Sequence, residues 1–203
     1  MIGVVSYGMG NIRSVCNALE HLGHEPLVAS APDDLDKVDR IILPGVGAFP
    51  AAMERLGTTG FADALNTQVR ARGKPVLGIC LGMQLLGEIG TEFGDCAGLG
   101  WIPGRVEIIP RGESNLRLPQ IGWNELEVRE GAQLFTNIEG DSSCYFVHSY
   151  QLLTTDPSDV VATVDYGGPV TAAVERDNIF GAQFHPEKSA RVGLAVLDNF
   201  ANI

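Results

Sequence analysis

Apolar residues recur with two different periods along the first half of the chain. Short apolar runs, which predict buried strands, occupy residues 2–6, 25–30 and 40–43, and a fourth run leads from Val76 into Cys80. Between them, residues 11–22 carry apolar side chains at helical spacing, and residues 51–72 predict one or two helices broken near residues 57–60. Strands that alternate with helices predict right-handed crossovers and a central parallel sheet with helices on both faces.

The second half of the chain has a different pattern. Turn-forming and β-branched residues dominate residues 94–165, which predicts short strands, several of them antiparallel, as over residues 104–110 and 143–150. Residues 111–117 have the composition of an exposed loop.

Strands and a helix are predicted again near the end of the sequence. Residues 170–176 and 178–183 predict two strands joined by a tight turn near Asp177, and residues 188–201 predict a closing helix. No repeat, low-complexity tract or linker interrupts the pattern. The sequence therefore predicts an α/β fold in a single domain over residues 1–203. We expect a central, mostly parallel sheet flanked by helices and a smaller antiparallel sheet from the second half.

Composition and charge narrow the class of protein. With 203 residues, 45% of them hydrophobic, the chain can bury the core of one α/β domain. Its formal net charge of −11 argues against binding a nucleic-acid backbone or an anionic membrane through broad electrostatics. The sequence has neither a basic segment followed by a long apolar stretch nor a run of ~18 apolar residues, so we expect no signal peptide and no membrane helix.

The cysteines indicate a reducing, cytoplasmic setting. Cys16, Cys80, Cys96 and Cys144 are scattered, without CxxC spacing or a disulfide-dense framework. The histidines and cysteines also lack the spacing of metal ligands, and the turn at residues 8–10 lacks a full dinucleotide-binding fingerprint. We therefore expect neither a metal nor a nucleotide cofactor.

Cys80 lies where the apolar run gives way to helical spacing. Gly78 and Gly82 flank it in the sequence Gly-Ile-Cys-Leu-Gly, which is the pattern of a nucleophile elbow with cysteine in place of serine. A turn this sharp strains the central residue and leaves no room for neighbouring Cβ atoms. The sulfur would then lie at a helix N-terminus, which favours the thiolate. The alternative is a buried cysteine in a glycine-rich turn.

Two other glycine-rich turns follow early strands, at residues 7–11 and 44–48. Both should reach the same sheet edge as Cys80, where open α/β sheets bind ligands. We expect the backbone amide of Leu81 and an amide of the 44–47 turn to act as oxyanion donors in acyl transfer. An ordinary tight turn remains the alternative for residues 44–47.

His185 is the strongest candidate for the base that a cysteine nucleophile needs. Pro186 favours an extended backbone at His185, and in an extended backbone residues i and i+2 project to the same side. Glu187 should therefore lie beside the imidazole, orient it and leave the other ring nitrogen to take the thiol proton. The alternative is a surface histidine after a strand. Of the other histidines, His21 and His24 flank a helix end and should be solvated. His148 follows an apolar strand and could line the site, but we favour a structural or positioning role for it.

Together these motifs resemble the class I, triad-type glutamine amidotransferases. The resemblance rests on residues 78–84 around Cys80 and residues 183–187 around His185. Further motifs narrow it to the glutaminase subunits of imidazole glycerol phosphate synthases and span nearly the whole chain, at residues 7–14, 43–49, 119–124 and 146–150.

The resemblance implies a flavodoxin-like class I amidotransferase fold and a defined reaction. Cys80 attacks the side-chain amide of glutamine, His185 acts as general base and acid, and Glu187 orients His185. The ammonia passes to a (β/α)8-barrel cyclase subunit, which forms a heterodimer with the glutaminase. In histidine biosynthesis the cyclase makes imidazole glycerol phosphate and an aminoimidazole carboxamide ribotide.

The resemblance also implies roles for other residues. Gln84 and Glu92 would hold the polar ends of the substrate, and the backbone of Ser149 and Tyr150 would help to seat it. The oxyanion turn would consist of Gly45, Val46 and Gly47. The Val46 peptide would reorient before the site becomes competent for catalysis. Positions that face the partner or gate the site would be Asn11, Ser14, Tyr145 and Lys188. A solvated side chain remains the alternative for Lys188.

Two positions depart from the pattern of many relatives, which carry histidine at the position of Gln120 and aspartate at that of Ser6. Neither departure affects the triad. Two other functions stay open on the sequence alone. One is the glutaminase of another ammonia-using enzyme, such as pyridoxal phosphate synthase. The other is a non-catalytic, thiol-sensing member of the fold that uses Cys80 as an exposed thiol.

Overall fold

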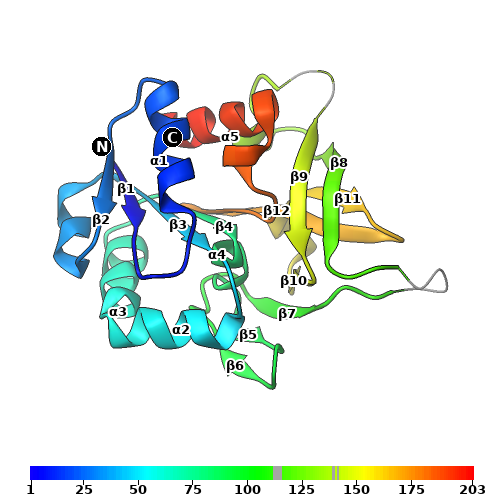
Figure 1. Cartoon of the computed structure of the whole chain (residues 1–203), viewed down its shortest axis with the longest axis horizontal. Coiled ribbons are helices and arrows are strands. Elements are labelled where there is room, and N and C mark those ends of the chain that lie inside the picture. The colour runs from blue at the N-terminus through cyan, green and yellow to red at the C-terminus, as the bar shows by residue number, and fades with distance from the viewer. Residues whose placement is uncertain (112–115, 139, 141) are drawn as a thin grey trace.

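A nine-stranded mixed sheet forms the centre of the molecule (Figure 1). The computed structural model describes residues 1–111, 116–138, 140 and 142–203. Five neighbouring strands of the sheet are parallel, in the spatial order β2 (Pro26–Ala29), β1 (Ile2–Val5), β3 (Arg40–Gly45), β4 (Val76–Cys80) and β13 (Ile179–Ala182). The sheet continues antiparallel through β12 (Pro169–Arg176), β11 (Val160–Asp165), β8 (Gln120–Val128) and β9 (Ser143–His148).

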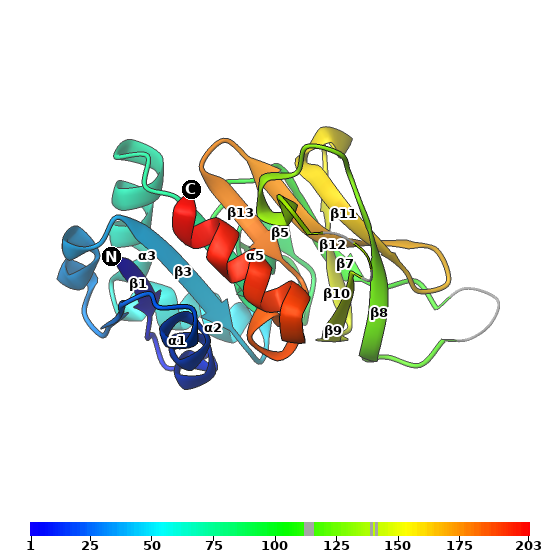
Figure 2. The same cartoon turned by 90° about the horizontal axis from the view of Figure 1, so that it is seen from above.

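Helices cover both faces of the parallel half, as the alternating pattern predicts. One face carries α1 (Ile12–His21) and α5 (Ala190–Asn202), and the other carries α2 (Phe49–Thr58) and α3 (Phe61–Leu65) (Figures 1 and 2). The expected break between the last two falls at Gly60, whose φ is 78°. The chain continues from α3 as a π-helical segment, Asn66–Ala71. Each helical layer has its own apolar cluster against the sheet.

A second, four-stranded sheet packs beside the first. Its order is β10 (Tyr150–Thr154), β7 (Gly104–Ile108), β5 (Ile89–Gly90) and β6 (Cys96–Ala97), and only the β5–β7 pair is parallel. The smaller sheet expected from the second half is thus present, but most antiparallel strands of that half extend the main sheet instead. The cause is the tight turn at Asp177, with φ of 53°, which folds β12 back against β13.

The helix predicted after Cys80 is much shorter than expected. It is a single turn, α4 (Leu81–Gln84). Carbonyl groups that would continue it are taken by a later segment, since Leu85 O accepts from Leu99 N at 2.8 Å and Leu86 O accepts from Trp101 N at 2.9 Å. Leu85 and Leu86 therefore have helical spacing but pack as part of a connection.

Smaller differences concern 3₁₀ turns, which short-range patterns rarely reveal. The closing helix begins at Ala190 rather than at residue 188, because Pro186–Lys188 form a separate 3₁₀ turn. Other such turns are Pro32–Lys37, Gln133–Phe135 and Pro157–Asp159. The loop expected over residues 111–117 lies largely outside the described residues. In the part of the chain that the structure describes, no helix is both long and apolar enough to cross a membrane.

Candidate active site

Cys80 is the last residue of β4, immediately precedes α4 and has the strained backbone expected of a nucleophile elbow. Its φ is 53° and its ψ is −112°, a backbone conformation that residues other than glycine rarely adopt. A Cβ atom at Gly78 would lie 2.6 Å from Gly82 O, and a Cβ atom at Gly82 would lie 1.8 Å from Leu43 O. Both flanking positions therefore require glycine. The prediction of a strand-to-helix turn at Cys80 is confirmed.

The sulfur of Cys80 lines a pocket and lies next to one polar group of β9 and one of Gln183, the residue that follows β13. Its Sγ is 4.0 Å from Val147 O and 3.8 Å from Gln183 Nε2. Because α4 has only one turn, few peptide dipoles align behind the sulfur. The helix dipole at the sulfur is therefore weaker than we expected.

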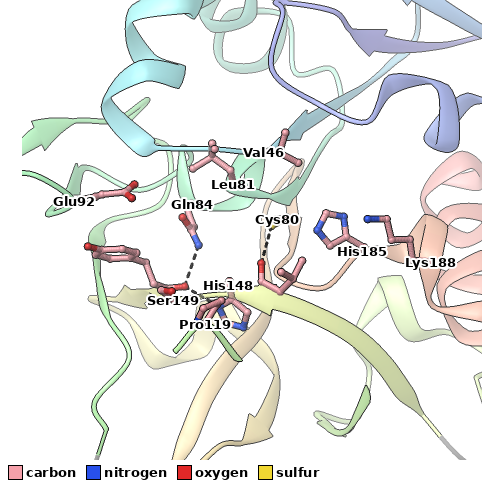
Figure 3. Close-up of a pocket in the computed structure, with 13 residues that line it drawn as sticks. Val46, Cys80, Leu81, Gln84, Glu92, Pro119, His148, Ser149, His185 and Lys188 are labelled. Carbon is pink, nitrogen blue, oxygen red and sulfur yellow. Dashed lines mark hydrogen bonds between the residues drawn. The ribbon is translucent and has the colours of Figure 1, made fainter. Parts of the chain in front are cut away.

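His185 lies beside Cys80, although the two are far apart in sequence (Figure 3). Its Nδ1 is 2.9 Å from Glu187 Oε1, and both side chains are almost fully buried. The backbone at His185 is extended, as Pro186 requires, but Glu187 reaches the ring from a 3₁₀ turn and not from a continuous extended segment. The predicted contact is therefore present with a different local geometry. Since Nδ1 is paired with Glu187, the ring nitrogen left for the sulfur is Nε2.

The charge of His185 depends on these same neighbours. Burial alone would lower the pKa of His185. Hydrogen bonding to Cys80 and Glu187, and attraction to their charges, outweigh burial and raise the pKa to about 9. A pKa of about 9 keeps the imidazole protonated at neutral pH, which is the state it has after accepting the proton of a thiol nucleophile. The geometry is that of a base held by an orienting carboxylate.

The pocket above Cys80 has a volume of about 410 Å³ and brings together residues from both sheets. Figure 3 shows Gln84 and Glu92 on one side of Cys80, and His185 and Lys188 on the other. Ten of its lining residues were predicted for the site: Val46, Gly47, Cys80, Leu81, Gln84, Glu92, Ser149, Tyr150, His185 and Lys188. Three more line it without having been assigned a role in binding or catalysis, namely Pro119, Val147 and His148.

The 45–47 turn packs directly against the nucleophile elbow. Gly45 pairs with Cys80 in the β3–β4 ladder, and a Cβ atom at Gly45 would lie 2.7 Å from Gly82 N. Gly47 has a φ of 102°, which favours glycine. The turn at residues 8–10 lies against this one, since a Cβ atom at Gly10 would be 3.2 Å from Pro44 Cγ. Both turns therefore reach the sheet edge that holds Cys80, as expected.

Gln84 and Glu92 are held in place by hydrogen bonds within the protein. Gln84 Nε2 donates to Tyr150 O and to Gln183 Oε1, each at 3.0 Å. Glu92 Oε2 accepts from Phe49 N at 2.8 Å, at the N-terminus of α2. Both side chains are thus oriented before any substrate enters the pocket.

His148 is a buried imidazole at the pocket wall. Burial lowers its pKa to about 4, and nearby His185 acts in the same direction, although the backbone carbonyl of Tyr150 opposes them. The Nδ1 atom lies 2.8 Å from that carbonyl, so Nδ1 carries the proton of the neutral ring. The Nε2 atom is buried without a hydrogen-bond partner among the described residues.

The residues expected to face a partner lie in two places. Lys188 is exposed at the pocket rim, and Tyr145 is half-buried on β9, with its ring 6.0 Å from that of Trp123. Asn11 and Ser14 lie at the start of α1, next to the 7–11 turn, and line no part of the pocket.

Gln183 contacts both Cys80 and Gln84, and the sequence motifs gave it no role of its own. Among the described residues, no group of three or more His, Cys, Asp or Glu side chains is arranged to hold a metal ion.

Comparison with known proteins identifies the family. The model of the family described as "Glutamine amidotransferase class-I" matches residues 4–202. The chain is 43% identical to imidazole glycerol phosphate synthase subunit HisH of Leptospira interrogans, and 45% identical to subunit HisH 1 of Campylobacter jejuni strain RM1221. Each alignment covers 100% of both chains.

Solved structures share the fold. PurLQS from Thermotoga maritima superposes with a TM-score of 0.78 at 25% identity, covering 99% of this chain and 97% of that one. A structure described as a glutamine amidotransferase gives a TM-score of 0.76 at 22% identity, with 98% of each chain covered. The chain therefore belongs to the class I glutamine amidotransferases and, within them, to the HisH subunits of imidazole glycerol phosphate synthase.

Proposed function

We propose that the chain releases ammonia from glutamine at Cys80 and delivers it to a cyclase subunit for histidine biosynthesis. The observation that carries the proposal is the contact between His185 and Glu187, 2.9 Å long and buried beside a cysteine in a nucleophile elbow. The membership in the HisH group supports the choice of glutamine as substrate.

In the first half of the reaction, His185 Nε2 takes the thiol proton and Cys80 Sγ attacks the amide carbon of glutamine. The developing oxyanion receives hydrogen bonds from the amide of Leu81 and from the 45–47 turn. His185 then gives its proton to the amide nitrogen, the C–N bond breaks, and ammonia leaves behind a thioester on Cys80. Glu187 stabilises the imidazolium that forms between the two proton transfers.

In the second half, water replaces ammonia. His185 takes a proton from the water molecule, whose oxygen attacks the thioester carbon, and the C–S bond breaks to release glutamate and restore the thiol. Because Gln84 and Glu92 lie on the side of the pocket away from His185, we assign them to the amino and carboxylate end of the substrate (Figure 3). The backbone of Ser149 and Tyr150 lines the same end.

For the partner we propose a (β/α)8-barrel cyclase that docks over the pocket rim and the edge of β8 and β9. Ile121 and Trp123 expose apolar side chains on β8, with 62% and 54% of their surfaces accessible. Trp123 contacts Tyr145 on β9, and Lys188 lies nearby at the pocket rim. Large aromatic and aliphatic side chains of this kind anchor protein interfaces. A thiol nucleophile also requires a reducing compartment, which supports a cytoplasmic location.

The test measures glutamine-dependent glutamate release by the chain alone and with the cyclase and its nucleotide ligand. We expect weak activity alone and strong stimulation in the complex. Cys80→Ala should abolish the use of glutamine, whereas synthesis driven by added ammonium should continue, because it bypasses this subunit. Normal glutamine-dependent turnover by a Cys80→Ala complex would contradict the mechanism.

A further inference from the structure

We propose that Gln183 is a positioning residue of this site, which joins the nucleophile Cys80 to the substrate-binding residue Gln84 through one carboxamide. The inference rests on the proposed function and adds a residue to it. Gln183 is fully buried. Its Nε2 lies 3.8 Å from Cys80 Sγ, and its Oε1 accepts from Gln84 Nε2 at 3.0 Å.

The direction of these two carboxamides is fixed by a backbone carbonyl. Tyr150 O can only accept hydrogen bonds, so the group of Gln84 that faces it must be the NH₂ group, at 3.0 Å. The same NH₂ group faces Gln183, whose oxygen must therefore point to Gln84. The NH₂ group of Gln183 is then left to face the sulfur. Reversing either amide would place two donors or two acceptors against each other.

The backbone holds Gln183 in this position. Gln183 follows β13, and its own N–H donates to Ala172 O of β12 at 2.8 Å. With the backbone fixed here, the side chain can turn away from the sulfur only by breaking its buried hydrogen bond with Gln84.

Two functions follow from this arrangement. An N–H donor aimed at sulfur stabilises the thiolate relative to the thiol and orients Sγ for attack. The bond from Gln84 to Gln183 uses the amide nitrogen of Gln84, so that Gln84 Oε1 remains as an acceptor for a donor group of the substrate. Gln183 thus acts on chemistry through Cys80 and on binding through Gln84.

The experiment compares two variants of Gln183 in the complex with the cyclase. Gln183→Glu keeps an acceptor for Gln84 and loses the donor to sulfur, whereas Gln183→Met loses both. We expect kcat for glutamine hydrolysis to fall about tenfold or more in both variants, because a hydrogen bond to a charged group is lost. The KM for glutamine should rise only in Gln183→Met, since only this variant releases Gln84.

A second measurement follows the sulfur directly. The rate at which iodoacetamide alkylates Cys80 at pH 7, measured by mass spectrometry of the peptide that contains it, should fall with kcat in both variants. The matched control is Gln68→Met, which removes another buried carboxamide, hydrogen-bonded to Asp36 at 2.7 Å and remote from the pocket. It should change neither the alkylation rate nor kcat.

Melting curves show whether each variant is folded, and Gln183→Glu alone decides the question if Gln183→Met does not fold. An alkylation rate and a kcat within twofold of the parent in a folded Gln183→Glu variant would overturn the inference. If Gln183→Glu behaves like the parent while Cys80→Ala is inactive in the same assay, the role of Gln183 is wrong but the proposed function stands. If Cys80→Ala is active, the proposed function fails as well.

Discussion

Gly82 lies so close to Leu43 that a Cβ atom on Gly82 would be 1.8 Å from the Leu43 carbonyl oxygen. The elbow at Cys80 and strand β3, which leads into the 45–47 turn, are therefore in direct backbone contact. This contact places the nucleophile and the proposed oxyanion turn at a fixed separation. Any group inserted between them has to displace backbone rather than a flexible side chain.

We predict that Gly82→Ala lowers the free energy of unfolding by about 3 kcal/mol or more, because the overlap is with a carbonyl of the central sheet. The same variant should lose glutamine hydrolysis, since the elbow has to move. Gly57→Ala is the control. A Cβ atom at Gly57 has nothing within 4 Å, and alanine favours the helix, so its unfolding free energy should stay within about 1 kcal/mol of the parent. Urea unfolding of both variants checks the difference, and equal effects would contradict the steric argument.

The contact between Glu187 and His185 leads to a second prediction. Glu187→Gln removes the negative charge from a buried contact of 2.9 Å, so the pKa of His185 should fall below its value of about 9. Glutamine hydrolysis should fall about 10²- to 10⁴-fold, because the base loses its orienting carboxylate. An NMR titration of the His185 ring measures the first effect, and steady-state kinetics the second. An unchanged pKa would show that Glu187 does not govern the charge of His185.

The same contact links stability to pH. The pKa of His185 rises on folding from 6.5 to about 9, so its protonation stabilises the folded state fully below pH 6.5. This contribution is lost as the pH rises through 9. Glu187→Gln should shift the upper end of that range to lower pH, which urea unfolding between about pH 6 and pH 10 detects. If Glu187→Gln loses stability over the same pH range as the parent, a group other than His185 causes the loss of stability at alkaline pH.

Much of the site could be predicted from sequence because its signals are local. Gly78 and Gly82 mark the elbow at Cys80, and Pro186 with Glu187 marks the base at His185, each within a few residues. The contact between Cys80 and His185 depends on the parallel pairing of β4 with β13, which the alternation of strands and helices predicts only in outline.

Features that depend on distant parts of the chain could not be predicted. Gln183 takes its role from Gln84 and Cys80, about a hundred positions away, and from a carbonyl on β10. The short length of α4 depends on Leu99 and Trp101, whose amides occupy the carbonyls that a longer helix would use. Hydrophobic periodicity carries no information about such competition between hydrogen bonds.

His148 gives a further prediction, at acidic pH. Its pKa falls on folding from 6.5 to about 4, so the folded state binds a proton less readily than the unfolded state. The stability that His148 contributes is present above pH 6.5 and is lost as the pH falls toward 4, by on the order of 3 kcal/mol. His148→Asn, whose amide can still donate to Tyr150 O, should lose less stability than the parent between about pH 7 and pH 4.5. Urea unfolding at the two pH values checks this, and equal losses would show that another group governs the acid range.

Trp123 leads to the last prediction, which concerns the partner. Its side chain is half-exposed on β8 and rests edge-on against Tyr145, with ring centroids 6.0 Å apart and planes at 63°, so it is held in one orientation before binding. A preoriented aromatic side chain that becomes buried typically contributes about 2 kcal/mol or more to an interface. Trp123→Ala should therefore weaken binding to the cyclase about 30-fold or more.

Val28→Ala is the matched control, because Val28 is similarly exposed but lies on β2, at the opposite end of the main sheet. Titration calorimetry measures the affinity of both variants for the cyclase and so shows which end of the sheet the cyclase contacts. Equal affinities for Trp123→Ala and the parent would place the partner on another surface.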